Sequence, residues 1–203
     1  KRLVLLGAGH AHLIVLRELA QSPPPDTELV VVSPSCWQYY SGMLPGWIAG
    51  HYKLDQCRIK VAPQVSAAGG ELILDRAVAL DAEHQKIRLE GGRQVDYDWL
   101  SIDIGSGSNL ADLEGYDDPL ISVKPIERFQ AQWREFEEQC QTTGAGHLVV
   151  VGGGAAGVEL AMAAANVVRH NHEGGGRVSL IAGDDGPLPG FNGLMRRLAA
   201  RKL

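Results

Sequence analysis

A glycine run late in the chain carries the strongest chemical signal. Gly152, Gly154 and Gly157 fit the pattern G-x-G-x-x-G. In such a run the first glycine permits a tight turn, the second lets the backbone approach a pyrophosphate, and the third lets a helix pack closely against a strand. The N-terminus of the following helix offers free N–H groups to the phosphates. The spacing predicts a dinucleotide-binding turn that includes Ala155 and Ala156; a glycine turn without a ligand is the alternative.

A second glycine turn, near the start of the chain, departs from this pattern. Gly7 and Gly9 take the first two positions, but His12 stands where the third glycine is expected. A side chain at this position should push the helix and the strand slightly apart. His10 and His12 form H-x-H, but the spacing suggests no further ligands, so we expect no metal site. The N–H groups around His10, Ala11 and His12 are the candidates for holding a phosphate.

The acidic residue that commonly binds a ribose at the end of the second strand is missing after both turns. The first such strand ends at Ser33, whose hydroxyl can still hydrogen-bond a ribose. The other ends at Ala182, with Asp184 just beyond it. Asp184 can reach a ribose and would repel a 2′-phosphate, which mildly favours NADH over NADPH.

Short apolar runs around each turn predict the elements that position it. RLVLL at 2–6 and ELVVV at 28–32 are typical of buried parallel strands, with a helix over 13–20 between them. The same order recurs between 147 and 182, with its helix starting at Val158. Strand, glycine turn, helix and strand make one βαβ unit, so the sequence predicts two such units.

The segments between the two units predict three different structures. Residues 35–60 are aromatic-rich and read as an irregular segment, either a surface loop or a ligand loop. Residues 69–104 read as an antiparallel meander with a hairpin turn at Gly91-Gly92. From Ile126 to Cys140 apolar side chains step by three and four, which predicts a helix with a core-facing stripe.

Composition excludes several classes. The chain of 203 residues carries a net charge of −5, and this mild acidity argues against a nucleic-acid binder. No apolar run reaches the roughly 18–20 residues of a transmembrane helix. The three cysteines, Cys36, Cys57 and Cys140, are widely spaced, which favours a reducing, cytoplasmic compartment over a disulfide scaffold. The chain starts without methionine and stops inside a basic helical pattern, so we expect a fragment.

The two turns begin 145 residues apart, and with the meander between them the chain resembles the flavin and pyridine nucleotide oxidoreductases. GGGAAGVELA at 152–161 fits that family's G-G-G-x-x-G-x-E-x-A. YDWLSIDIGS at 97–106 is similar to its Y-D-x-L-x-x-A-T-G-S, with Asp103-Ile104 where Ala-Thr is usual.

This resemblance implies an α/β, Rossmann-like FAD/NAD(P)-binding fold, a parallel sheet with an antiparallel β-meander. Residues 1–124 would form an FAD-binding domain and 125–203 an incomplete NAD(P)H-binding domain. The intact protein would transfer hydride from NAD(P)H to FAD and electrons to an acceptor such as a quinone.

The aromatic-rich segment narrows the resemblance. Residues 33–52 resemble the flavin loop of type II NADH dehydrogenases and sulfide:quinone reductases. The resemblance implies that the isoalloxazine is lined by Tyr40, Ser41, Gly42, Met43, Leu44 and Pro45. It adds Ser33, Pro34, Val78 and Gly105 to the candidate cofactor-binding residues. The combination of GHAH at 9–12 with YSGMLP at 40–45 most resembles the module fused to selenide, water dikinase. A redox or delivery module in selenium metabolism, with little turnover of its own, is therefore the alternative function.

Further expectations follow from the same resemblance. Glu159, on the first turn of its helix, is the candidate catalytic residue at the flavin–nicotinamide junction, or else an acidic residue favoured by the helix dipole. Cys36 and Cys57 are 21 residues apart and lack the C-x4-C or C-x2-C spacing of disulfide-reducing members. Cys36 is either a persulfide site or a spare small residue. Because His12 replaces the expected third glycine, a scaffold that binds only one nucleotide is a further alternative. The identity of the electron acceptor, the formation of a homodimer and peripheral contact with the inner membrane stay open.

Overall fold

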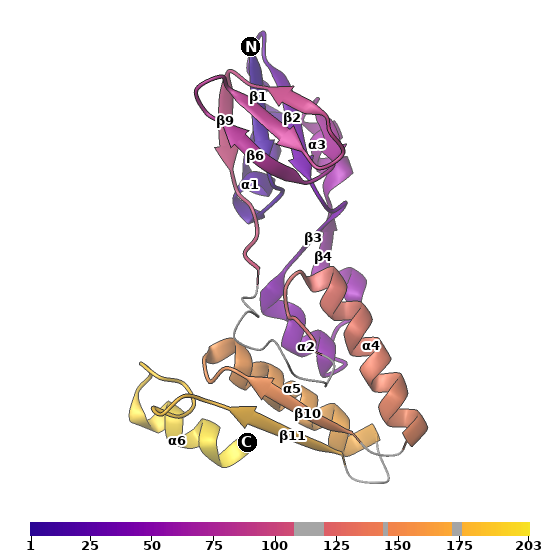
Figure 1. Cartoon of the computed structure of the whole chain (residues 1–203), viewed down its shortest axis with the longest axis vertical. Helices are drawn as coiled ribbons and strands as arrows, with labels where there is room; N and C mark the ends of the chain where they lie inside the picture. Colours follow the sequence, from indigo (N-terminus) through magenta and orange to yellow (C-terminus); the bar gives the residue numbers. More distant parts are fainter. Residues whose placement is uncertain (108–119, 144–145, 172–175) are drawn as a thin grey trace. The chain divides into compact units, whose positions relative to one another are not determined.

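The computed structural model describes residues 1–107, 120–143, 146–171 and 176–203 (Figure 1). The chain forms two compact units. The first consists of Lys1–Tyr39 and Arg58–Gly107, and the second of Tyr40–Cys57 and Ser108–Leu203. The aromatic-rich segment is thus divided between the two units. The expected FAD- and NAD(P)H-binding domains, 1–124 and 125–203, concern ligand binding and remain predictions.

A four-stranded parallel sheet lies at the centre of the first unit. Its strand order is β5–β2–β1–β9, with β5 (Glu71–Leu74), β2 (Glu28–Ser33), β1 (Arg2–Leu6) and β9 (Trp99–Ile102). The chain moves outward from β1 through β2 to β5 and then returns to the other side of β1 as β9. The carboxyl ends of β1 and β9 therefore form the switch point, where open α/β sheets bind their ligands.

Two layers cover this sheet. They contain β6 (Ala77–Asp81), β7 (Lys86–Leu89) and β8 (Gln94–Asp96) on one face, and α1 (His10–Gln21) and α3 (Val61–Ala67) on the other (Figure 1). Successive strand side chains point to opposite faces. Val4 accordingly packs with Ile87 of β7, whereas Leu5 packs with Leu16 of α1. The predicted α/β class, with a parallel sheet and antiparallel strands, is confirmed.

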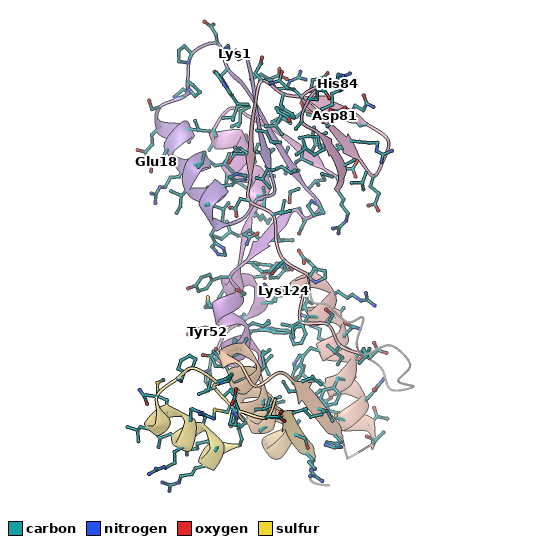
Figure 2. All side chains as sticks on the ribbon, turned by 60° about the vertical axis from the view of Figure 1, so that its left-hand side comes forward. Lys1, Glu18, Tyr52, Asp81, His84 and Lys124 are labelled. Atoms are coloured by element: carbon teal, nitrogen blue, oxygen red, sulfur yellow. The ribbon has the colours of Figure 1, made fainter. Side chains whose placement is uncertain are left out.

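The expected meander over 69–104 is wrong at both ends. Within residues 69–104 only β6, β7 and β8 pair antiparallel, whereas β5 and β9 are parallel neighbours of β2 and β1. A short apolar run does not specify the strand with which it pairs. Here β5 pairs with the open edge of β2, and β9 pairs with the open edge of β1. Figure 2 shows Asp81 and His84 together at the turn that joins β6 to β7, where the His84 ring lies 2.8 Å from the carboxylate.

Residues 35–60 are more regular than expected. β3 (Trp37–Tyr39) pairs antiparallel with β4 (Arg58–Lys60) in the first unit, and the Arg58 guanidinium lies 3.8 Å from the Trp37 ring centroid. The intervening residues hold α2 (Leu44–Ile48) between the short 3-10 helices η1 (Ser41–Met43) and η2 (Leu54–Cys57). Aromatic content alone did not indicate these short elements.

The second unit is built around a parallel strand pair. Its elements are β10 (His147–Val151), β11 (Arg177–Ile181), α4 (Ile126–Thr143), α5 (Ala155–Asn171) and α6 (Gly193–Lys202). The expected stripe on α4 is confirmed, since Phe129, Trp133 and Cys140 are buried. Phe129 and Trp133 share a core with Leu44 of α2 and Leu160 of α5.

Candidate functional site

The second glycine turn joins β10 to α5 with the geometry that the sequence predicts. Gly152 has φ of 121°, a left-handed conformation that favours glycine. A Cβ on Gly157 would overlap the carbonyl oxygen of Gly152, so no side chain fits between helix and strand. Apart from Gly154 and its two chain neighbours, no heavy atom of the described residues lies within 4 Å of a Cβ placed on Gly154. The space into which a pyrophosphate would approach is therefore open, and the turn fits a dinucleotide.

Hydrogen bonds fix this turn to the segment after β11. The N–H of Gly152 donates to Ile181 O at 2.9 Å, and the N–H of Leu188 donates to Gly153 O at 2.7 Å. Asp184 lies, exposed, in a turn closed by a bond from Gly186 N–H to Gly183 O. The exposed Ala155 and Ala156 begin α5. The second unit thus gathers the predicted Gly152–Gly157 turn and holds Asp184 in the segment that follows β11.

The candidate catalytic residue lies deeper in its helix than expected. α5 begins at Ala155 rather than at Val158, because the small residues of the turn already adopt helical conformation. Glu159 is therefore the fifth helical residue, exposed and beyond the first turn. The helix-dipole effect falls off within that turn, so the dipole explanation of Glu159 is wrong. Its place at a flavin–nicotinamide junction stays a prediction.

In the first unit, His12 lies in the first turn of α1, and its side chain contacts both the glycine turn and β9. Its imidazole is 2% exposed; Nδ1 lies 2.7 Å from Gly7 O and Nε2 lies 2.9 Å from Ser101 Oγ. A carbonyl oxygen can only accept, so Nδ1 donates to Gly7 O; in the neutral ring Nε2 then accepts from the Ser101 hydroxyl. The helix, which starts at His10 and not at residue 13, is tied through this ring to the glycine turn and to β9.

Asp103 is a site residue that the sequence reasoning missed. Its carboxylate Oδ2 accepts the His12 N–H at 2.9 Å, and its carbonyl accepts the Gly9 N–H at 3.3 Å. A Cβ on Gly9 would overlap this carboxyl group, and one on Gly7 would overlap the Asp103 carbonyl. In this conformation the first turn does not fit a pyrophosphate. The departure from Ala-Thr at 103–104 was the only signal.

The other candidates of the first unit lie around this turn or farther away. The Ser33 hydroxyl, which is buried, donates to Ser35 O at 2.9 Å and accepts the Ser35 N–H at 3.3 Å, so local bonds already engage it. Val78 is exposed, at the irregularity between Ala77 and Ala79. The exposed candidates His10, Ala11, Pro34 and Gly105 lie at the ends of the parallel strands or in the first turn of α1.

Tyr40–Pro45 belongs to the second unit. Tyr40 is exposed, and its N–H donates to Cys57 O at 2.8 Å. Ser41 and Gly42 are exposed, Met43 and Pro45 are half-buried. Leu44 is buried and packs with α4 and α5. The Leu44 side chain therefore has a packing role in this unit. Contact with an isoalloxazine remains a prediction for all six residues of the segment.

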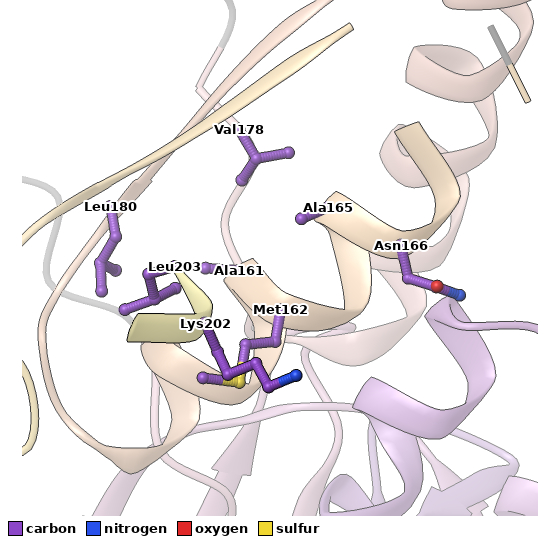
Figure 3. A pocket seen from close by; sticks show the side chains of 8 residues that line it. All are labelled: Ala161, Met162, Ala165, Asn166, Val178, Leu180, Lys202 and Leu203. Carbon is purple, nitrogen blue, oxygen red and sulfur yellow. The ribbon is translucent and has the colours of Figure 1, made fainter. Parts of the chain in front are cut away.

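Other features of the described residues add no second site. A pocket of about 220 Å³ between α5, β11 and α6 is lined mainly by apolar side chains, none from the two glycine turns (Figure 3). The described residues hold no group of three or more potential metal ligands. No helix in the described ranges is long and apolar enough to cross a membrane.

All three cysteines are free, and burial raises the pKa of the Cys57 and Cys140 thiols.

Comparisons with known proteins agree with this fold. A family model described as pyridine nucleotide-disulphide oxidoreductase matches residues 1–203. The structure of NDH2 from Plasmodium falciparum in complex with NADH has a TM-score of 0.79 and 20% identity, over 99% of this chain and 45% of that one. The sulfide:quinone oxidoreductase of Aquifex aeolicus has a TM-score of 0.68 and 15% identity, over 100% and 49%. A ferredoxin reductase from Rhodopseudomonas palustris gives 0.75 and 20%, over 99% and 48%. The chain thus spans about half the length of these similar structures.

Proposed function

Since the chain belongs to the pyridine nucleotide-disulphide oxidoreductase family, we propose that its second unit binds NAD(P)H and its first unit binds FAD. The observation that carries the proposal is the second glycine turn. It is open at Gly154, closed to any side chain at Gly157, and placed at the N-terminus of α5. Backbone N–H groups at a helix N-terminus favour a pyrophosphate.

A bound FAD would supply the redox chemistry, hydride transfer from NAD(P)H and electron transfer to an acceptor. What this chain contributes is binding and orientation of the nucleotides. A quinone is our proposed acceptor, supported by the similarity to a sulfide:quinone oxidoreductase. NADH is the proposed donor, because the exposed Asp184 carboxylate would repel a 2′-phosphate. Nothing in the described part of the chain favours the selenium-linked alternative.

Replacing Gly154 with alanine tests the assignment of the NAD(P)H site. The open surroundings of Gly154 let the protein fold with this methyl group, but the methyl would occupy the space of the pyrophosphate. We expect Gly154→Ala to weaken NADH binding at least about tenfold with an unchanged Tm, as measured by isothermal titration calorimetry. A parallel titration with NADPH tests the proposed preference for NADH.

The control is Gly193→Ala, at the start of α6, where a Cβ also meets open space among the described residues. This variant should bind NADH as the unchanged chain does. Equal NADH affinity in all three proteins, or no NADH binding by the unchanged chain, would overturn the assignment. Anaerobic addition of NADH to the FAD-loaded chain should bleach the visible flavin absorbance if hydride transfer occurs.

A further inference from the structure

The two glycine turns differ at the position that a phosphate must approach. Gly154, the second glycine of the later turn, borders open space among the described residues. Gly9, the second glycine of the earlier turn, borders the Asp103 carboxyl group so closely that a Cβ would overlap it. The second glycine of such a turn exists to let the backbone approach a pyrophosphate. In the first unit, therefore, an anionic side chain lies where the phosphates of a dinucleotide belong.

The Asp103 carboxylate also uses the same kind of donor that a phosphate would use. Its Oδ2 accepts the backbone N–H of His12 at 2.9 Å, in the first turn of α1. A negative charge at a helix N-terminus is favourable, whether it comes from a carboxylate or from a phosphate. Asp103 directly follows β9, next to the end of β1, and so occupies the switch point of the sheet.

His12 and Ser101 hold this arrangement together. The His12 ring bonds to Gly7 O on the turn and to Ser101 Oγ on β9, two residues before Asp103. The Gly9 N–H bonds to the Asp103 carbonyl. Helix, turn and strand are thus joined at several points, and Asp103 is held in place rather than left on a free loop.

We propose that Asp103 is an internal anion that occupies the phosphate position of the first glycine turn, so that a dinucleotide must displace its carboxylate in order to bind. The identity of that dinucleotide as FAD rests on the proposed function above. A phosphate placed beside Gly9 would be repelled by the Asp103 carboxylate. Only one of these two negative groups can accept the N–H groups at the start of α1. Asp103 therefore lowers the affinity of the first unit for a pyrophosphate.

Two substitutions separate the charge of Asp103 from its bulk. Asp103→Asn keeps an oxygen that can accept the His12 N–H but removes the charge; Asp103→Ala empties the space beside Gly9. We expect both variants to bind FAD at least about tenfold more tightly than the unchanged chain, measured by quenching of flavin fluorescence. Asp103→Ala, which loses the bond to His12, should also melt at a lower temperature.

Asp98→Asn is the matched control, since Asp98 is exposed and lies at the opposite end of β9. It should leave FAD affinity unchanged. An FAD affinity in both Asp103 variants that equals or falls below that of the unchanged chain would overturn the proposal and leave Asp103 as a structural cap.

A probe without a flavin keeps this test separate from the proposed function. If no variant binds FAD, the FAD assignment is wrong, and inorganic pyrophosphate decides the role of Asp103. Pyrophosphate should then shift the backbone amide resonances of Gly9 to His12 in Asp103→Ala more strongly than in the unchanged chain. Equal shifts, or none in either protein, would refute displacement at this turn.

Discussion

The side chains of His12 and Asp103 change one turn in a coordinated way. At the later turn the third glycine, Gly157, lies so close to the Gly152 carbonyl that no Cβ fits. At the earlier turn the His12 imidazole stands at the corresponding position, and both of its ring nitrogens have hydrogen-bond partners, which avoids the cost of an unpaired buried polar group. The carboxylate of Asp103 then accepts the His12 N–H. The two unusual residues of the first unit are thus neighbours.

The cysteines differ enough in burial to predict their reactivity. Burial raises the pKa of the Cys57 and Cys140 thiols, and the nearby Glu137 carboxylate adds to the rise at Cys140. Because the thiolate is the reactive form, and because Cys36 is exposed, iodoacetamide should modify Cys36 first in the folded protein. Peptide mass spectrometry over time measures this order.

Unfolding in guanidinium should remove the difference and serves as the control. Modification of Cys57 or Cys140 in the folded protein at the rate of Cys36 would show that the cores around them open readily.

At the scale of elements, the turn between β6 and β7 carries the clearest charge effect. The backbone N–H of His84 donates to the Asp81 carboxylate at 3.0 Å, and the His84 ring lies 2.8 Å from it. These bonds, the backbone one first, hold the pKa of Asp81 below its ordinary value. A carboxyl pKa that is lower in the folded state stabilises the fold at pH values above the unfolded-state pKa. This contribution is lost as the pH falls through the folded-state pKa.

Asp81→Asn removes this charge while keeping an oxygen acceptor. We expect the unchanged chain to be more stable than the variant at neutral pH, with the difference shrinking as the pH falls below about 4. Urea unfolding across this pH range measures the effect. A difference that stays constant with pH would show that the Asp81 charge contributes nothing to stability.

At the scale of the whole molecule, the buried residues fall into separate cores. The parallel sheet of the first unit has one cluster on each face. The second unit has a core of its own in which α2, α4 and α5 meet. Trp133 lies there at 3% exposure, stacked against Phe129 with ring centroids 6.2 Å apart.

Trp133→Ala should therefore destabilise the second unit by roughly 3–5 kcal/mol. Hydrogen exchange followed by mass spectrometry should show lost protection in α4 and α5, with β1 and β2 protected as before. Trp99→Ala is the control, because Trp99 lies in the first unit at 47% exposure. Equal loss of protection in β1 and α5 after Trp133→Ala would mean that the two units unfold together.

The sequence by itself determined the parts of this protein that depend on local geometry. In the later turn Gly152 is favoured by its left-handed backbone conformation and Gly157 by its close approach to the Gly152 carbonyl, and the glycine spacing in the sequence indicates both positions directly. Buried strands such as Arg2–Leu6 and His147–Val151 are continuous apolar runs that need no knowledge of their partners. The stripe on α4 follows from helical periodicity alone.

Only the tertiary structure decided which distant segments meet. Strand β9 pairs with β1 across almost a hundred residues, and this pairing brings Asp103 to the turn at Gly9. Likewise Leu44 packs with the helices of the second unit, although its sequence neighbours before Tyr40 belong to the first. Local patterns carry no information about such contacts, because they arise from shape and edge complementarity between whole elements. That is why the sequence showed an unusual residue at Asp103 but not its contact with the first turn.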